Sequence, residues 1–301
     1  MPKAVEPKSI KAGATIGIVA PASAPNKTEI DKAVEILKSH GFKVQLGKYI
    51  YNTHRSFSAC DEYRLADFQW AIDSNEIDAI ICARGGYGSQ RILEKIDLNH
   101  FKKKPKWIAG FSDITAIHNY ILKTSNICTI HGPMLSTFIK DDKENEDVID
   151  LINMLKGERA KFLINKHKLN REGEFSGQMI GGNLAVLTSM MATSYHPSIK
   201  NKILFIEDIN EDLYKLDRMM QTLKLGNLDK LGALVCGHFT NCKAGSPEFA
   251  KNAYSVIHDA IKEYKFPVSY GFPSGHEQPN MPWIHGKKYN LRVGSEHTSL
   301  E

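Results

Sequence analysis

The first 135 residues alternate between short apolar runs and longer segments in which apolar and polar residues are mixed. Apolar runs predict strands over residues 15–20, 77–82 and 107–109, and the branched side chains of residues 15–20 fit a buried strand. Residues 43–46 are expected to form a further strand. Between these runs, apolar residues return every three or four positions, which predicts helices over residues 29–40, 63–74, 90–95 and 114–123. Such alternation is typical of a mainly parallel sheet with helices on both faces.

The pattern changes after a polar stretch between about residues 140 and 170. Residues 141–147 form a charge run with the composition of a solvated surface. Small residues at 181–185 open a predicted helix that runs to residue 191. Further on, the pattern predicts strands over 202–206 and 231–239, a helix over 213–223, and short strands and loops in the last 35 residues. We therefore expect two domains, residues 1–150 and 170–301.

Composition narrows the class of protein. Hydrophobic residues make up 42% of the 301 residues, which excludes a mainly disordered chain. A net charge of +5 is too small for a nucleic-acid-binding protein, and the basic run 102–106, which lacks interleaved aromatic residues, is expected to be a solvated turn. No apolar segment is long enough for a membrane span or a signal peptide. Five scattered cysteines without a CxxC pattern favour a reduced, cytoplasmic protein.

Adjacent glycines follow the strand predicted over residues 77–82, in the segment Arg84-Gly-Gly-Tyr-Gly88. Because glycine has no Cβ, the backbone N–H groups of such a turn can approach a ligand closely. Neither GxxxxGK[ST] nor GxGxxG fits the segment. The residues alone leave open a phosphate cradle, an oxyanion hole for acyl transfer and a plain tight turn.

A serine occupies the next strand-to-helix turn, in the segment Gly110-Phe-Ser-Asp-Ile-Thr115. Enzymes with the pattern GxSxG hold a nucleophilic serine outward at such a turn. Ile114 replaces the second glycine of that pattern, and Ser112 also stands where a helix N-cap is common. The residues therefore support the nucleophile and the N-cap equally.

Carboxylates follow the strand predicted over residues 202–206. Glu207 comes first, and a carboxylate at a strand end can orient a catalytic histidine. Helix capping or a surface ion pair is the simpler interpretation of Glu207 by itself. Asp208, Glu211 and Asp212 compete with it for the orienting role.

Twelve histidines offer several candidates for a general base. His276 follows a glycine in a proline-rich loop, which suits an accessible imidazole. Its competitors are His131, His238 and His285. A zinc site built from His276, Glu277 and His285 lacks HExxH or any comparable spacing, so we expect no metal.

Taken together and in order, these segments resemble the serine LD-carboxypeptidase family, which includes the murein tetrapeptide carboxypeptidases and the related microcin-C immunity peptidases. The resemblance extends from about residue 10 to residue 290. It is carried by Ile16-Gly-Ile-Val-Ala-Pro-Ala-Ser23, Arg84-Gly-Gly-Tyr-Gly88 with Arg91, Gly110-Phe-Ser-Asp-Ile-Thr115, His131-Gly-Pro133, Gly181-Gly-Asn-Leu184, Phe205-Ile-Glu-Asp208 with Tyr214 and Asp217-Arg218, and Gly275-His276.

The resemblance implies a fold and a set of site residues. The fold is a flavodoxin-like, mainly parallel N-terminal α/β domain followed by a smaller β-rich C-terminal domain, commonly in a homodimer. The implied triad has its nucleophile on the first domain and its two partners on the second: Ser112 as nucleophile, Glu207 as orienting carboxylate and His276 as general base. Backbone N–H groups of Gly85, Gly86 and Asp113 would form the oxyanion hole.

The resemblance also implies the activity, which is acyl transfer without metal or cofactor. The substrate would be a small peptide, the murein tetrapeptide, which loses its terminal D-alanine in peptidoglycan recycling. Arg84 and Arg91 are near in sequence and could bind its terminal carboxylate. Two alternatives stay open. One is an immunity peptidase that cleaves a peptidyl-nucleotide antibiotic, in which Trp283 could stack on the base or only pack; the other is a non-catalytic anion-binding module.

Overall fold

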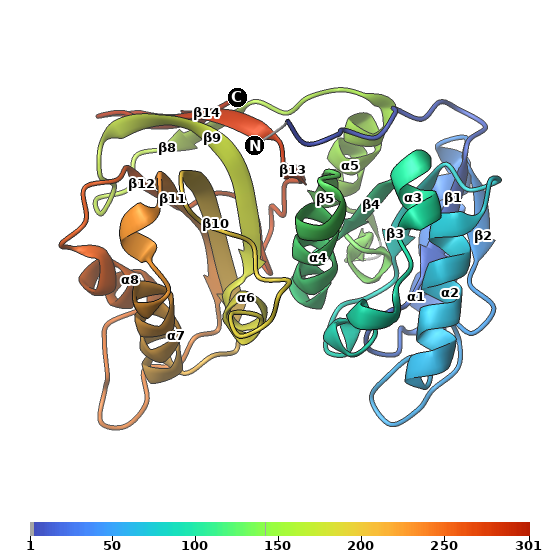
Figure 1. Ribbon diagram of the computed structural model, residues 1–301, viewed down its shortest axis with the longest axis horizontal. Coiled ribbons are helices and arrows are strands. Elements are labelled where there is room, and N and C mark those ends of the chain that lie inside the picture. Colours follow the sequence, from blue (N-terminus) through green and yellow to red (C-terminus); the bar gives the residue numbers. More distant parts are fainter. Residues whose placement is uncertain (1–2, 142) are drawn as a thin grey trace. The chain divides into compact units, whose positions relative to one another are not determined.

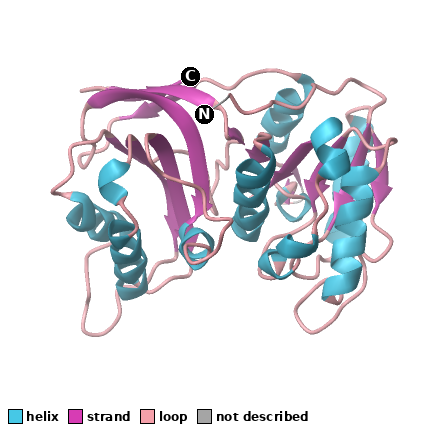
Figure 2. Cartoon of the chain, viewed as in Figure 1, coloured by secondary structure: helices cyan, strands magenta, loops and turns pink. Residues whose placement is uncertain are grey.

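The computed structural model describes residues 3–141 and 143–301, and the chain folds as two compact units (Figure 1). The first unit comprises the residues up to Ala160 together with Met281–His285. The second comprises Lys161–Asn280 and Gly286–Glu301. Each unit contains its own sheet and its own helices (Figure 2).

A six-stranded sheet forms the centre of the first unit, in the order β13-β5-β4-β3-β1-β2. Five strands are parallel, and β13 runs antiparallel to β5 at one edge. The strands are β1 (Thr15–Val19), β2 (Lys43–Leu46), β3 (Ala79–Cys82), β4 (Trp107–Gly110), β5 (Thr129–His131) and β13 (Trp283–His285). The predicted parallel α/β fold of the N-terminal part is thus confirmed.

Helices and short turns connect these strands. The α-helices are α1 (Lys27–Ser39), α2 (Asp61–Asp73), α3 (Asn99–Lys103), α4 (Thr115–Ser125) and α5 (Glu146–Lys156). The 3₁₀ turns are η1 (Ser89–Arg91), η2 (Leu93–Lys95), η3 (Ser112–Ile114) and η4 (Leu135–Thr137). Strands β6 (Ile139–Lys140) and β7 (Lys143–Glu144) pair in antiparallel fashion. The helix expected over 90–95 is instead the pair η1 and η2, and α5 begins inside the charge run.

Local sequence explains the boundaries of α1. The Asn26 side chain accepts hydrogen bonds from the backbone N–H groups of Thr28 (2.9 Å) and Glu29 (3.3 Å), which caps the first turn. The residues with helical spacing are buried: Ile30, Ala33, Val34 and Leu37. Gly41, with φ of +85°, follows the helix and ends it.

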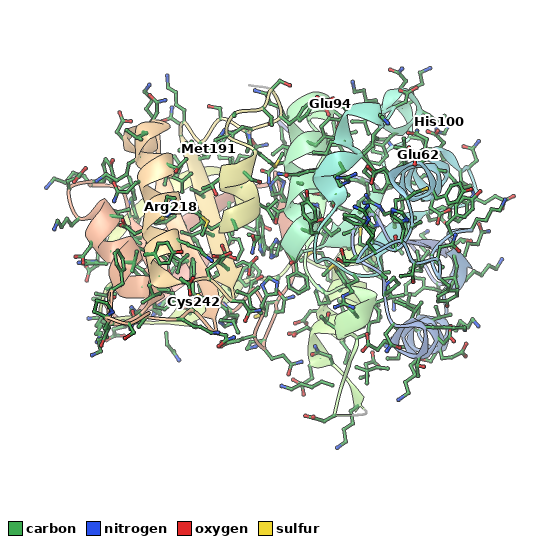
Figure 3. All side chains as sticks on the ribbon, turned by 90° about the horizontal axis from the view of Figure 1, so that it is seen from below. Glu62, Glu94, His100, Met191, Arg218 and Cys242 are labelled. Atoms are coloured by element: carbon green, nitrogen blue, oxygen red, sulfur yellow. The ribbon has the colours of Figure 1, made fainter. Side chains whose placement is uncertain are left out.

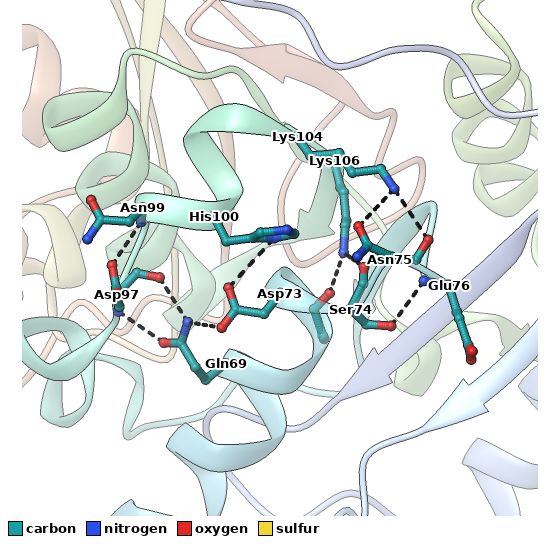
Figure 4. A network of polar contacts seen from close by, with 11 residues as sticks. Gln69, Asp73, Ser74, Asn75, Glu76, Asp97, Asn99, His100, Lys104 and Lys106 are labelled. Atoms are coloured by element: carbon teal, nitrogen blue, oxygen red, sulfur yellow. Dashed lines mark hydrogen bonds and ion pairs between the residues drawn. The ribbon is translucent and has the colours of Figure 1, made fainter.

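Lys106 differs from the expectation for the basic run 102–106, because its side chain is only 3% exposed. Its Nζ donates to the carbonyl oxygens of Ala71 (2.9 Å) and Ser74 at the end of α2 (Figure 4). Burial lowers the pKa of the Lys106 ammonium to about 8. The last lysine of the run therefore caps a helix, whereas Lys102, Lys103 and Lys104 are exposed.

A seven-stranded mixed sheet forms the second unit, in the order β12-β11-β10-β9-β14-β15-β8. Strands β9 to β12 are parallel, and β14, β15 and β8 continue the sheet in antiparallel fashion. Their bounds are β8 (Phe162–Asn165), β9 (Gly173–Asn183), β10 (Lys202–Ile209), β11 (Ala233–Thr240), β12 (Val268–Tyr270), β14 (Lys288–Val293) and β15 (His297–Leu300). The separate C-terminal sheet domain is confirmed.

Three α-helices accompany this second sheet: α6 (Leu184–Ser189), α7 (Leu213–Leu225) and α8 (Ala253–Ile261), with the 3₁₀ turn η5 (Leu228–Lys230). The helix expected from the small residues at 181–185 starts only at Leu184, because residues 173–183 belong to strand β9. Within residues 3–141 and 143–301, none of the helices combines the length and apolar character that a bilayer crossing needs.

Candidate active site

Ser112 lies in η3, between the end of β4 at Gly110 and the start of α4 at Thr115. Its φ of +60° falls in the left-handed region, which few residues other than glycine adopt. A Cβ on Gly110 would approach the Ile114 side chain to 3.0 Å. Ile114, which breaks the GxSxG pattern, thus fills the space beside Gly110, and the strained turn at Ser112 is retained.

Gly85 touches the Ser112 side chain. A Cβ at Gly85 would lie 2.9 Å from Ser112 Cβ and 3.1 Å from Ser112 Oγ. At Gly86, which has φ of +97°, a Cβ would overlap the Ser23 side chain. The two glycines predicted for an oxyanion hole therefore lie where side chains would collide, one of them directly against Ser112.

The carboxylate of Asp113 joins this serine turn to the glycine turn. Its Oδ2 accepts a hydrogen bond from the backbone N–H of Ser89 (2.8 Å), one residue after Gly88. Asp113 is buried, and burial raises the pKa of its carboxyl group. Sequence reasoning used only the backbone of Asp113 and missed this side-chain contact.

Arg64 of α2 forms a hydrogen bond to the same glycine turn, and sequence reasoning also missed it. Its guanidinium donates to the carbonyl oxygens of Gly88 (2.9 Å) and Pro21 and forms an ion pair with Asp61. Arg64 is 1% exposed. Its place on the buried side of α2, four residues before Phe68, is the pattern that could have revealed it.

Two of the competing histidines belong to a buried aromatic group of the first unit. His131 stacks on Trp283 with ring centroids 5.0 Å apart, and His285 stacks on His118 at 5.7 Å. His118 Nε2 donates to the carbonyl oxygen of Gly110 (2.8 Å), and burial lowers the pKa of His118 to about 4. Trp283 is fully buried and packs in this core.

In the second unit, Glu207 and His276 form a close pair. His276 Nδ1 lies 2.6 Å from Glu207 Oε2, and Glu207 is 0% exposed. Glu207 lies near the end of β10, where the pairing of β10 with β11 shifts register between Ile206 and Asp208. Such a bulge re-aims side chains, which allows Glu207 to face the loop that follows β12.

Charge and burial shift the pKa of His276 in opposite directions. Burial disfavours the imidazolium, whereas the negative charge and hydrogen bond of Glu207, together with the charge of Asp208, favour it. The net result is a pKa of His276 above its usual value. With Nδ1–H donating to Glu207, Nε2 is the nitrogen that can take up a proton.

Close backbone packing holds the His276 loop. Gly275 has φ of +134°, which residues with side chains rarely adopt, and a Cβ there would lie 3.2 Å from Glu207 Oε2. The Gly275 N–H donates to Asn280 Oδ1 (3.0 Å), and the backbone N–H of His238 donates to the Ser274 carbonyl oxygen (2.9 Å). The glycine before His276 thus allows the loop to pack closely against Glu207.

The other candidates occupy different places. Glu211 and Asp212 lie near Lys215, at 4.0 and 3.2 Å, and His238 Nε2 lies 3.0 Å from the Pro279 carbonyl oxygen. In the described part of the chain, no group of three or more His, Cys, Asp and Glu side chains is arranged to hold a metal ion.

The two arginines suggested for a substrate carboxylate differ in their present partners. Arg91, 46% exposed, forms an ion pair with Asp61 at 2.8 Å. Arg84 is exposed and donates to the carbonyl oxygen of Ala24 (3.1 Å).

Comparison with known proteins agrees with the architecture. The family profile of the LD-carboxypeptidase N-terminal domain matches residues 16–132, and that of the C-terminal domain matches residues 176–291. The probable murein peptide carboxypeptidase of Bacillus subtilis is 34% identical over 98% of this chain and 94% of its own length. The microcin C7 self-immunity protein MccF of Escherichia coli is 27% identical over 96% of this chain and 93% of its own.

A solved structure shares the same fold over almost the whole length. The crystal structure of muramoyltetrapeptide carboxypeptidase from Oxalobacter formigenes superposes with a TM-score of 0.88 and 27% identity, covering 95% of this chain and 98% of that one. Both family profiles, the Bacillus relative and this structure lead to one conclusion: the chain belongs to the LD-carboxypeptidase family.

Proposed function

We propose that the protein is a serine LD-carboxypeptidase that removes the terminal D-alanine from murein tetrapeptides in peptidoglycan recycling. The observation that carries the proposal is the 2.6 Å contact between His276 and the buried Glu207, in a chain that belongs to a carboxypeptidase family. A histidine oriented by a carboxylate is the base that a serine nucleophile needs. Ser112 supplies the nucleophile, held in a strained strand-to-helix turn.

The proposed reaction proceeds through an acyl-enzyme. His276 Nε2 takes the proton of Ser112 Oγ as Oγ attacks the scissile carbonyl carbon, and Glu207 stabilises the resulting imidazolium. The imidazolium then gives its proton to the amine of D-alanine as the C–N bond breaks. Water, deprotonated by His276, hydrolyses the ester and regenerates Ser112.

Backbone N–H groups at Gly85, Gly86 and Asp113 are the proposed donors to the tetrahedral oxyanion. The contact of Gly85 with Ser112 supports this assignment, because an oxyanion formed at Ser112 develops close to its Oγ. Arg84 is the better candidate for the terminal carboxylate, because the guanidinium of Arg91 is already paired with Asp61.

Release of D-alanine from a murein tetrapeptide tests the proposal. We expect the purified chain to release D-alanine, and Ser112→Ala to lower kcat/KM by roughly 10⁴-fold or more because no acyl-enzyme forms. Ser125→Ala, which changes a serine at the end of α4, is the matched control and should keep wild-type activity. Undiminished D-alanine release by Ser112→Ala would exclude Ser112 as the nucleophile.

Cleavage of a peptidyl-nucleotide antibiotic is the second candidate function, favoured by the similarity to the microcin C7 self-immunity protein. Trp283, the aromatic residue considered for stacking on a nucleotide base, is buried against His131 and gives this candidate no support. Assaying both substrates at equal concentration separates the two functions: a larger kcat/KM for the tetrapeptide is expected.

We also propose that the protein works in the cytoplasm as a homodimer. All five cysteines are free thiols, which fits a reducing compartment. Light scattering coupled to gel filtration measures the mass in solution, and a mass of one chain would contradict the dimer.

A further inference from the structure

A second buried carboxylate adjoins the Glu207–His276 pair. Asp208 is 2% exposed, and its oxygens accept three hydrogen bonds, each 2.9 Å long. The donors are the side-chain amide of Asn183 and the backbone N–H groups of Ala185 and Ile209. The reaction proposed above uses no part of this carboxylate.

The donors to Asp208 place it at the junction of three elements. Asn183 ends β9, pairs in register with Glu207, and caps α6 by accepting from the backbone N–H of Val186 (3.1 Å). Two residues earlier, a Cβ on Gly181 would overlap the carbonyl oxygen of Phe205, so β9 and β10 pack with no side chain between them. Asp208 thus ties the β9–α6 junction to the strand segment that carries Glu207.

The charged and titratable groups around Asp208 come from three directions. Glu207 precedes it on β10, His276 comes from the loop after β12, and Cys242 follows β11. Of these residues, Cys242 is labelled in Figure 3. Helix α6, whose N-terminus Asp208 contacts, has no titratable side chain. Burial raises the pKa of the Cys242 thiol to about 11, so this thiol is neutral near pH 7 and Glu207 and His276 dominate the local charge.

The protonation of the Glu207–His276 pair responds to the neighbouring carboxylate of Asp208. Glu207 Oε2 contacts His276, whereas Glu207 Oε1 is buried without a hydrogen-bond partner in the described part of the chain. A buried carboxylate that accepts few hydrogen bonds is stabilised in its ionised form mainly by its cationic partner. A second negative charge nearby makes the protonated state of that partner still more favourable. Burial, followed by the charge of Glu207, raises the pKa of Asp208 to about 7.

We propose that Asp208 is a positioning residue for the Glu207–His276 pair, which anchors the β9–α6 junction beside Glu207 and supplies a second negative charge that keeps His276 basic. The catalytic meaning of this role rests on the proposed function. The effect on His276 itself does not, because it follows from contacts and charges within the second unit.

The test follows the titration of the His276 imidazole by NMR in the full chain. In Asp208→Asn the midpoint should fall by up to about one pH unit relative to wild type, because the ionised form of Asp208, whose pKa is about 7, no longer stabilises the imidazolium. The acidic limb of kcat/KM on the tetrapeptide should move to lower pH in parallel. Asp212→Asn removes a partly exposed carboxylate four residues away, and this control should leave the midpoint unchanged.

A second variant covers the case in which Asp208→Asn does not fold. Asn183→Ser keeps an N-capping side chain but removes the amide that donates to Asp208, so Asp208 should be more protonated and the His276 midpoint should fall by a smaller amount. An unchanged midpoint in every folded variant would overturn the proposal. If the midpoints shift but wild type releases no D-alanine, the proposed function fails and the role of Asp208 stands.

Discussion

Ser112 is the residue at which local strain and candidate chemistry coincide. A non-glycine residue in the left-handed region costs about 1–3 kcal/mol, and such strain persists where the surrounding contacts leave the backbone no alternative. Those contacts are visible on both sides of the turn. Gly110, which precedes Ser112, packs against the Ile114 side chain. Asp113, which follows Ser112, accepts a hydrogen bond from the backbone N–H of Ser89.

Gly85→Ala tests how tightly this arrangement is packed. The new methyl group would press on Ser112 Cβ and Oγ, and we expect the rate of Ser112 labelling by a fluorophosphonate to fall about 100-fold, because displacing a reacting atom by about an ångström has effects of that size. Gly41→Ala adds a methyl group whose one neighbour within 4 Å is Ala12 Cβ, at 3.9 Å, and it controls for a glycine-to-alanine change away from Ser112. Equal labelling rates in wild type and Gly85→Ala would show that the contact is unimportant.

The sequence predicted the position of the Ser112 turn but not its geometry. The strand before it and the helix after it follow from hydrophobic spacing, whereas the approach of Gly85 joins segments 27 residues apart and has no local pattern. The choice of His276 over His131, His238 and His285 came from the family resemblance. In the structure, burial separates His131 and His285 from His276, because these two lie in the core of the first unit. His238 is half-buried like His276, and what distinguishes it is its partner, the Pro279 carbonyl oxygen.

At the scale of elements, one carbonyl oxygen joins β4, β5 and α4. The oxygen of Gly110 accepts from His118 Nε2 on α4 (2.8 Å) and from the backbone N–H of Gly132 after β5 (3.1 Å). His118 is fully buried. The start of the Ser112 turn is therefore held by a histidine that is neutral in the folded protein.

His118 links stability to pH. In the unfolded chain its imidazole binds a proton below about pH 6.5, but in the folded chain only near pH 4. The unfolded state thus gains a proton first, and the free energy of unfolding should fall as pH drops from about 6.5 to 4. Denaturation of His118→Gln, which keeps a donor but does not titrate, should show a smaller acid loss by about 1–3 kcal/mol.

A histidine on the surface provides the control for this measurement. His297 is exposed, so His297→Gln should have the same acid sensitivity as wild type. If His118→Gln also matches wild type between pH 6.5 and 4, the burial of His118 does not control the acid response.

Some elements were predictable and others were not, for physical reasons. Apolar runs revealed β1, β3 and β4, and amphipathic spacing revealed α1 and α2. Strand β9 escaped prediction because its sequence, GEFSGQMIGGN, is rich in glycine and polar residues that have low strand propensity. Helix α5 escaped because the charge run hid its N-cap, Asn145.

At the scale of the whole molecule, the two units are not formed by two consecutive halves of the chain. The chain leaves the first unit after Ala160, returns for Met281–His285, and then leaves again. Strand β13, which makes this return, covers the edge of β5 with a pairing of Trp283 to His131. No sequence pattern marks this pairing, because three residues of strand are too few to show a period and their partners lie about 150 positions away.

Truncation tests the contribution of β13. A fragment of residues 1–160 should unfold without a sharp thermal transition and should aggregate, because the β5 edge and its apolar neighbours lose their cover. Joining residues 281–285 to the fragment through a flexible linker should restore a cooperative transition. A cooperative melt of the bare fragment would show that β13 is dispensable.

The return of β13 also affects how the protein can be made. A ribosome adding about 5–20 residues per second needs roughly 10–30 seconds to proceed from β5 to β13. During that interval the nascent first unit has five of its six strands and an uncovered edge. Chaperones that shield an exposed strand edge thus have an opportunity to bind between the synthesis of β5 and the synthesis of β13.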